Sequence, residues 1–242
     1  MIRSILTALI IVCSPFFINL HAQAQFTGWL ASFNTIKTGK NTSLHTDIQL
    51  RSTNQWQQTQ TILLRPGINF HLNKRIIATA GYAFINNKRI MGNVAGFAPE
   101  HRIWEQLLFN HKLKTIFISH RFRIEQRFLS KVIIVNNELE TNGSVYANRF
   151  RYFNRNIFPF KKEKAFSTGM FAALQNEIFI NIGNTANVNG EIFDQNRLYL
   201  ALGYRPHPKA DIEIGYMNQY VNGKGNLFTN NHILQLAGYL RL

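Results

Sequence analysis

Arginine and glutamate side chains alternate with apolar ones in the stretch SHRFRIEQRF, residues 119–128. Its charged members are Arg121, Arg123, Glu125 and Arg127, and all four occupy odd-numbered positions. Successive side chains of a β-strand point to opposite faces, so a strand here would carry these charges on one face and Phe and Ile on the other. Guanidinium groups beside a carboxylate can form ion pairs or hold an anion.

The same parity rule brings further charges from other segments onto one interior face. We predict an interior charge network, or a ligand-binding set, made of Glu100, Arg102, Arg121, Arg123, Glu125, Arg127, Arg149, Arg151, Glu177 and Arg197. Four more charged residues are expected to point inward, namely Asp47, Arg51, Arg65 and Glu213. Arginine outnumbers the acids, and carboxylates near arginines favour ion pairing over general acid catalysis.

Other chemistry has little support in the sequence. Ser119 and His120 are adjacent, but a strand would send their side chains to opposite faces, so they cannot form a nucleophile–base pair. The histidines lack close ligand spacing, and the single cysteine, Cys13, lies near the N-terminus. We therefore predict no catalytic residue, no metal site, no cofactor and no enzymatic activity.

The elements that must position the charges are predicted to be strands, because period-two alternation recurs along the chain. The predicted strands are 26–36, 42–52, 59–71, 75–86, 100–111, 115–128, 145–156, 167–181, 193–204, 209–221 and 230–242. Most approach the roughly 9–11 residues that a tilted strand needs to cross a bilayer. A sustained 3.6-residue period with helix caps is absent, so we predict no long helix.

The connections between these segments alternate in length. Short ones lie near 72–74, 112–114 and 206–209, and long polar ones lie at 86–99, 129–144, 183–191 and 222–230. This alternation is typical of an outer-membrane β-barrel, with apolar side chains outward, polar ones inward and aromatic girdles at both interfaces. A soluble barrel or sandwich of reversed polarity is the alternative.

The fold prediction is thus all-β, a single antiparallel transmembrane-type β-barrel of about 10–12 strands. Bacterial single-chain barrels usually have an even number of strands, and eleven segments are predicted here. Either the segment 26–36 does not span the membrane, which leaves ten strands, or one predicted segment contains two strands.

The N-terminal stretch MIRSILTALIIVCSPFFINLHAQAQ has an early cation, an apolar run and a small-x-small motif at 22–24. This pattern predicts a signal peptide over 1–24 and a barrel domain over 25–242.

The chain is strongly basic, with a formal charge of +15. Basic chains can bind nucleic acid, anionic lipid or acidic ligands. Export argues against nucleic acid, so the expected location is the outer membrane of a Gram-negative envelope, and the expected partner is its lipid.

Several stretches resemble a known family. They are SLHTDIQLRS, LLRPGINFHLNK, PEHRIWEQLL, SHRFRIEQRF, NRFRYF and FDQNRLYLALGYR. In this order they resemble the bacterial domain-of-unknown-function family 2490 over nearly the whole mature chain. Members are similar to outer-membrane β-barrels, and the family has no established activity. The resemblance therefore implies the fold and leaves the function open.

Three classes of function stay open for such a barrel. The first is a structural or ligand-binding barrel, whose arginine-rich lumen is braced by acids and takes a small anionic ligand. The second is a narrow, porin-like pore or transporter that prefers anions, because excess cationic charge attracts them. The third is an outer-membrane lipid-modifying enzyme, which would need a nucleophile and a base within hydrogen-bond reach.

Overall fold

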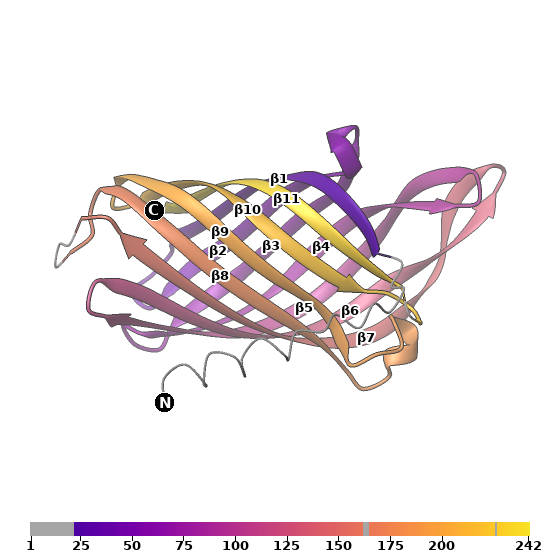
Figure 1. The fold of residues 1–242 in the computed structure, drawn as a ribbon. Coiled ribbons are helices and arrows are strands. Elements are labelled where there is room, and N and C mark those ends of the chain that lie inside the picture. The colour runs from indigo at the N-terminus through magenta and orange to yellow at the C-terminus, as the bar shows by residue number, and fades with distance from the viewer. Residues whose placement is uncertain (1–21, 162–164, 226) are drawn as a thin grey trace, which may run out of the picture.

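The computed structural model describes residues 22–161, 165–225 and 227–242, and these form a closed β-barrel of eleven strands (Figure 1). The strands are β1 (Ala22–Lys37), β2 (Thr42–Ser52), β3 (Thr59–His71), β4 (Ile76–Met91), β5 (Val94–Leu113), β6 (Ile116–Val135), β7 (Glu138–Pro159), β8 (Gly169–Ile182), β9 (Phe193–His207), β10 (Ala210–Asn222) and β11 (Phe228–Arg241). Two short 3-10 helices, η1 (Asn54–Trp56) and η2 (Thr185–Asn187), lie in connections. Within the described part of the chain, no helix is long and apolar enough to cross a membrane.

The first and last strands close the barrel by pairing in parallel. Ala22 lies opposite Phe228 and Thr35 opposite Arg241, whereas the other ten neighbouring pairs are antiparallel. An odd number of strands joined by reversing connections leaves the first and last strands running in the same direction, so only a parallel pair can close the sheet. The expectation of an even number is wrong, because the segment 26–36 belongs to a full strand of the wall.

Two predicted long loops are instead extensions of strands. β4 and β5 continue to a tight turn at Gly92 and Asn93, and β6 and β7 continue to a turn at Asn136 and Asn137. β-branched residues such as those in KVIIV, residues 131–135, favour continued pairing. Both hairpins project from one end of the barrel (Figure 1), which we call the hairpin end. The opposite end, where β11 finishes, is the C-terminal end.

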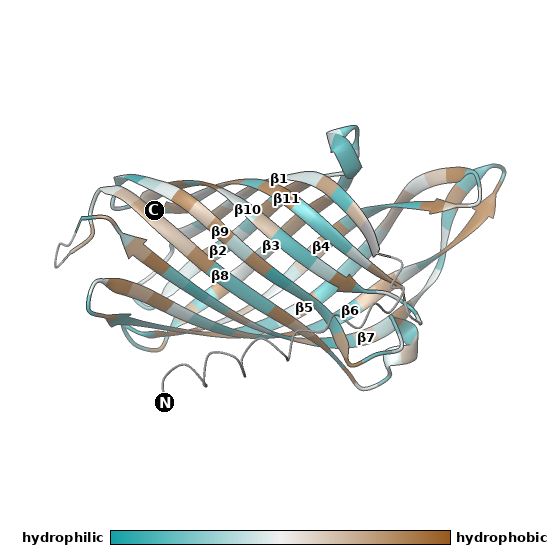
Figure 2. Ribbon diagram, in the orientation of Figure 1, coloured by the Kyte–Doolittle hydropathy of each residue, from teal (hydrophilic) through white to brown (hydrophobic). Residues whose placement is uncertain are grey.

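The two faces of the wall differ in polarity, as the alternation predicts. Ile124 and Leu200 are exposed on the outside, at 45% and 54%, whereas Arg123 and Glu125 are buried inside, at 1% and 0%. Figure 2 shows brown and teal residues alternating along the strands. The outer face is therefore rich in exposed Leu, Ile and Phe, and the inner face is rich in charged and amide side chains, which is the reverse of a soluble barrel.

Two glycines make room for the indole ring of Trp104. Trp104 is fully buried, and a Cβ atom on Gly67 or Gly81 would lie 2.7 or 2.5 Å from its indole ring. A side chain at either position would therefore displace the indole. The guanidinium of Arg123 lies 4.5 Å from the same ring centroid, so the glycines help to place a charged residue.

The predicted signal peptide lies almost wholly outside the described residues. The described residues begin at Ala22, where β1 starts. The cleavage site predicted after Ala24 stays a prediction.

Candidate functional site

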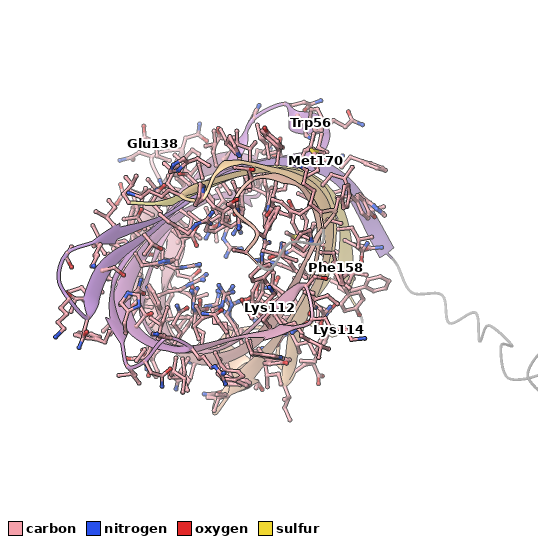
Figure 3. All side chains as sticks on the ribbon, turned by 90° about the vertical axis from the view of Figure 1, so that its left-hand side faces the viewer. Trp56, Lys112, Lys114, Glu138, Phe158 and Met170 are labelled. Atoms are coloured by element: carbon pink, nitrogen blue, oxygen red, sulfur yellow. The ribbon has the colours of Figure 1, made fainter. Side chains whose placement is uncertain are left out.

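The lumen contains two cavities that meet at its middle. One, of about 420 Å³, is lined by residues near the C-terminal end such as Asn34 and Arg241. The other, of about 460 Å³, is lined by residues near the hairpin end such as Gln25 and Lys88. The side chains that line both are Trp29, Arg51, Arg65, Arg151 and Arg197, which we call the waist. Figure 3 looks into the barrel from the C-terminal end and shows nitrogen-tipped side chains projecting inward.

Glu125 on β6 is the central acid of the charge network. Its carboxylate accepts from Arg151 Nη1 at 2.5 Å and from Arg149 Nη2 at 2.6 Å. Arg102 and Arg123 contact it at 3.5 and 3.9 Å. The register explains this meeting, because Glu125 lies opposite Arg149 on β7 and opposite Trp104 on β5. One carboxylate thus balances guanidinium groups from three strands.

Two further glutamates, Glu100 and Glu177, each accept hydrogen bonds from two arginines of the network. Glu100 accepts from Arg102 Nε and Arg127 Nε, each at 2.7 Å. Glu177 on β8 accepts from Arg121 Nη2 and Arg151 Nη2, each at 2.7 Å. Arg151 therefore links Glu125 to Glu177, and Arg102 links Glu125 to Glu100. The ion pairs connect the consecutive strands β5, β6, β7 and β8 along the inner wall.

All ten residues of the predicted network face the interior. The acids Glu100, Glu125 and Glu177 are at most 5% exposed. Arg123 and Arg197 are the least closely paired members, since the nearest carboxylate oxygen of each, on Glu125 and on Glu177, is 3.9 Å away. Of the other residues expected to point inward, Asp47 and Arg65 form their own pair at 2.7 Å.

The sequence analysis missed several ion-pairing residues. Asp194 pairs with Arg149 at 2.8 Å, and Arg155 pairs with Glu213, which was expected to point inward. Near the C-terminal end, Asp211 accepts from Arg205 Nε at 2.6 Å and lies 2.9 Å from Arg241. The parity of Arg149 and Arg151 would have identified Arg155, and the parity of Glu213 would have identified Asp211.

Positive charge exceeds negative charge in this interior. In the described part of the chain, the ion pairs distribute eleven arginines over seven acids. Arg51 has no carboxylate within ion-pair distance among the described residues and donates instead to Gln49 Oε1. Buried like charges are costly unless acids or bound anions offset them. The described residues include no cluster of three metal-ligating side chains.

Three comparisons relate this chain to known proteins. A solved structure described as NanC porin is similar at 12% identity with a TM-score of 0.45, covering 80% of this chain and 84% of that one. An uncharacterised protein of Methylorubrum extorquens is 26% identical over 196 residues, which is 81% of this chain and 78% of that protein. The model of the family described as protein of unknown function DUF2490 matches residues 26–231. The chain therefore belongs to the DUF2490 family.

Proposed function

We propose that this protein is a Gram-negative outer-membrane β-barrel whose arginine-rich lumen, braced by a few acids, binds a small anionic ligand. The observation that carries this proposal is the shortage of acids: seven carboxylates face eleven paired arginines and Arg51. An anion in the lumen would supply the missing negative charge. The outward Leu, Ile and Phe side chains support a lipid environment.

Cell fractionation tests the location. The full chain, expressed in a Gram-negative host, should appear in the outer-membrane fraction and show heat-modifiable gel mobility. Recovery from the periplasm as a soluble species without detergent would contradict the membrane assignment.

Calorimetric titration of the detergent-solubilised barrel with acetate and chloride, against a neutral solute of similar size such as acetamide, tests the anion preference. Binding of the anions without binding of acetamide supports the proposal, and the affinity should fall as ionic strength rises. Equal heats for all three solutes would contradict it.

A narrow anion-preferring pore is the second candidate. The two cavities share five lining residues, so they adjoin inside one barrel. Stepwise, anion-selective currents in planar bilayers would favour this function over binding alone. The absence of current in a barrel that still binds anions would exclude it.

An enzymatic function is not part of the proposal. Ser43 Oγ lies 2.9 Å from His71 Nε2, but Asn69 Nδ2 also donates to this oxygen, and Ser43 is only 2% exposed. A nucleophile needs access to its substrate, so the burial of Ser43 favours a structural hydrogen-bond chain over hydrolysis.

A further inference from the structure

The waist holds two guanidinium groups against one indole ring. The guanidinium carbon of Arg51 lies 3.9 Å from the ring centroid of Trp29, and that of Arg197 lies 5.0 Å from it. Arg197 also lies 4.7 Å from the ring of Phe179. Cation–π contacts fix the planes of both groups without neutralising their charge.

These two arginines are the waist members without a close acid. Arg65 and Arg151 are paired with carboxylates at 2.7 Å or less. Arg51 donates two hydrogen bonds, from Nε at 3.1 Å and from Nη2 at 2.6 Å, to the neutral amide oxygen of Gln49. Arg51 and Arg197 carry like charges against the same indole ring, so they repel each other. Among the described residues, no carboxylate lies within hydrogen-bond distance of either guanidinium, so the waist has the charge and the donors for an anionic head group.

The cavities on the two sides of the waist differ in chemistry. The hairpin-end cavity is lined mainly by amides, hydroxyls and cations, for example Gln60, Asn87 and Lys88. The C-terminal cavity adds a larger set of apolar and aromatic side chains, among them Phe33, Leu108, Phe153, Tyr199, Met217 and Tyr239. Apolar surface that lines a cavity favours an apolar ligand group. The hairpin-end cavity has fewer such side chains, namely Leu63, Ile85, Phe179 and Val221, so the C-terminal side of the waist is the more favourable place for the ring of an anionic ligand.

We propose that the ligand is a small aromatic carboxylate, with its carboxylate between Arg51 and Arg197 and its ring in the C-terminal cavity. This inference rests on the proposed function and specifies its ligand class. A planar carboxylate matches the donor fork of a guanidinium. The C-terminal cavity, at about 420 Å³, lies within the usual size range of small-molecule sites.

Calorimetric titration of the detergent-solubilised full chain with benzoate, acetate and benzyl alcohol tests the inference. Benzoate should bind about tenfold or more tightly than acetate, because it adds an apolar ring. Benzyl alcohol, which has the ring without the charge, should bind more weakly than benzoate. Phe153→Leu should reduce the affinity for benzoate and leave that for acetate unchanged.

Variants at the waist locate the site. Arg51→Gln and Arg197→Gln should each weaken benzoate about tenfold or more, since each removes a charged donor. Lys88→Gln is the matched control, because it removes one positive charge from the hairpin-end cavity, away from the waist. Heat-modifiable mobility of every variant verifies that the barrel is folded. Arg197→Lys keeps the charge but not the planar fork, and should restore only part of the affinity.

The possible failures are distinguishable. Equal affinities for benzoate and acetate would overturn the aromatic ligand and leave the anion-binding lumen intact. Weakening by Lys88→Gln as large as that by Arg197→Gln would overturn the waist as the site. A folded barrel that binds neither anion would overturn both this inference and the proposed function.

Discussion

Replacing Glu125 by glutamine isolates the contribution of the central acid to stability. The change keeps the size of the side chain and removes one negative charge from a site that is 0% exposed. Arg149 would still have Asp194, and Arg151 would still have Glu177. Arg123, in contrast, would have no carboxylate left within ion-pair distance, because Glu125 at 3.9 Å is its only one among the described residues.

The expected loss of unfolding free energy is about 3–5 kcal/mol, which is typical for removing one partner of a buried ion pair. Because three of the four arginines around Glu125, namely Arg102, Arg149 and Arg151, keep another acid, we expect a value near 3 kcal/mol. Arg123→Gln should cost less, about 1 kcal/mol, because the hydrogen bonds of Arg123 end on the neutral amide of Gln106. The acids are the scarcer partners, so losing one should cost more than losing an arginine.

Urea unfolding in lipid vesicles, followed by tryptophan fluorescence, measures both changes. Glu138→Gln is the matched control, because Glu138 is exposed at the turn of the β6–β7 hairpin. It should change the unfolding free energy by no more than about 0.5 kcal/mol. If Glu125→Gln were as mild as Glu138→Gln, water would be screening the lumen charges, and the bracing role of the acids would be refuted.

The same barrel gives three further expectations. Leu200→Arg should destabilise the protein in bilayers by about 2–4 kcal/mol, because Leu200 faces outward. Ile90→Arg, near the hairpin turn, should have only a small effect. Equal unfolding midpoints for the two variants would contradict the lipid-facing assignment of Leu200. Gly81→Ala should lower the unfolding free energy by about 1–3 kcal/mol in the same urea assay, because the new Cβ atom displaces Trp104. Gly238→Ala should be near neutral, because a Cβ atom there meets no atom within 4 Å. Similar losses of unfolding free energy would argue against close packing around Gly81. Surface labelling of intact cells should place an epitope directly after the predicted cleavage site on the same side as one at Asn136, since β1 begins at the hairpin end, and labelling on opposite sides would contradict the parallel closure.

Local alternation predicted most of the interior, because a strand wall repeats the same two-residue geometry throughout. It failed where that geometry is interrupted. Phe193 pairs with Ile180 and Gln195 with Phe179, so Asp194 is an additional residue at a register shift. Counting back from Arg197 by twos would turn Asp194 outward, yet it lies inside and pairs with Arg149. A one-residue irregularity of this kind leaves no trace in the period of the sequence.

The closure of the barrel was also beyond local patterns. The pairing of β1 with β11 depends on the count of all strands and on contacts between distant segments. The waist depends on local alternation and on barrel closure. Alternation predicts that Arg51 and Arg197 point inward, but only the closed barrel brings Trp29 on β1 against Arg197 on β9.

The parallel seam has a consequence for assembly. Every other interface joins strands that are neighbours in the chain, but the seam brings Ala22 beside Phe228, a sequence separation of 228 − 22 = 206 residues. Contacts with such long separation carry a large loop-closure entropy and form slowly. We expect the chain to pass through an open, curved sheet whose two unpaired edges are β1 and β11. Until they meet, each edge can recruit a strand from another molecule, so the seam is where assembly and aggregation compete.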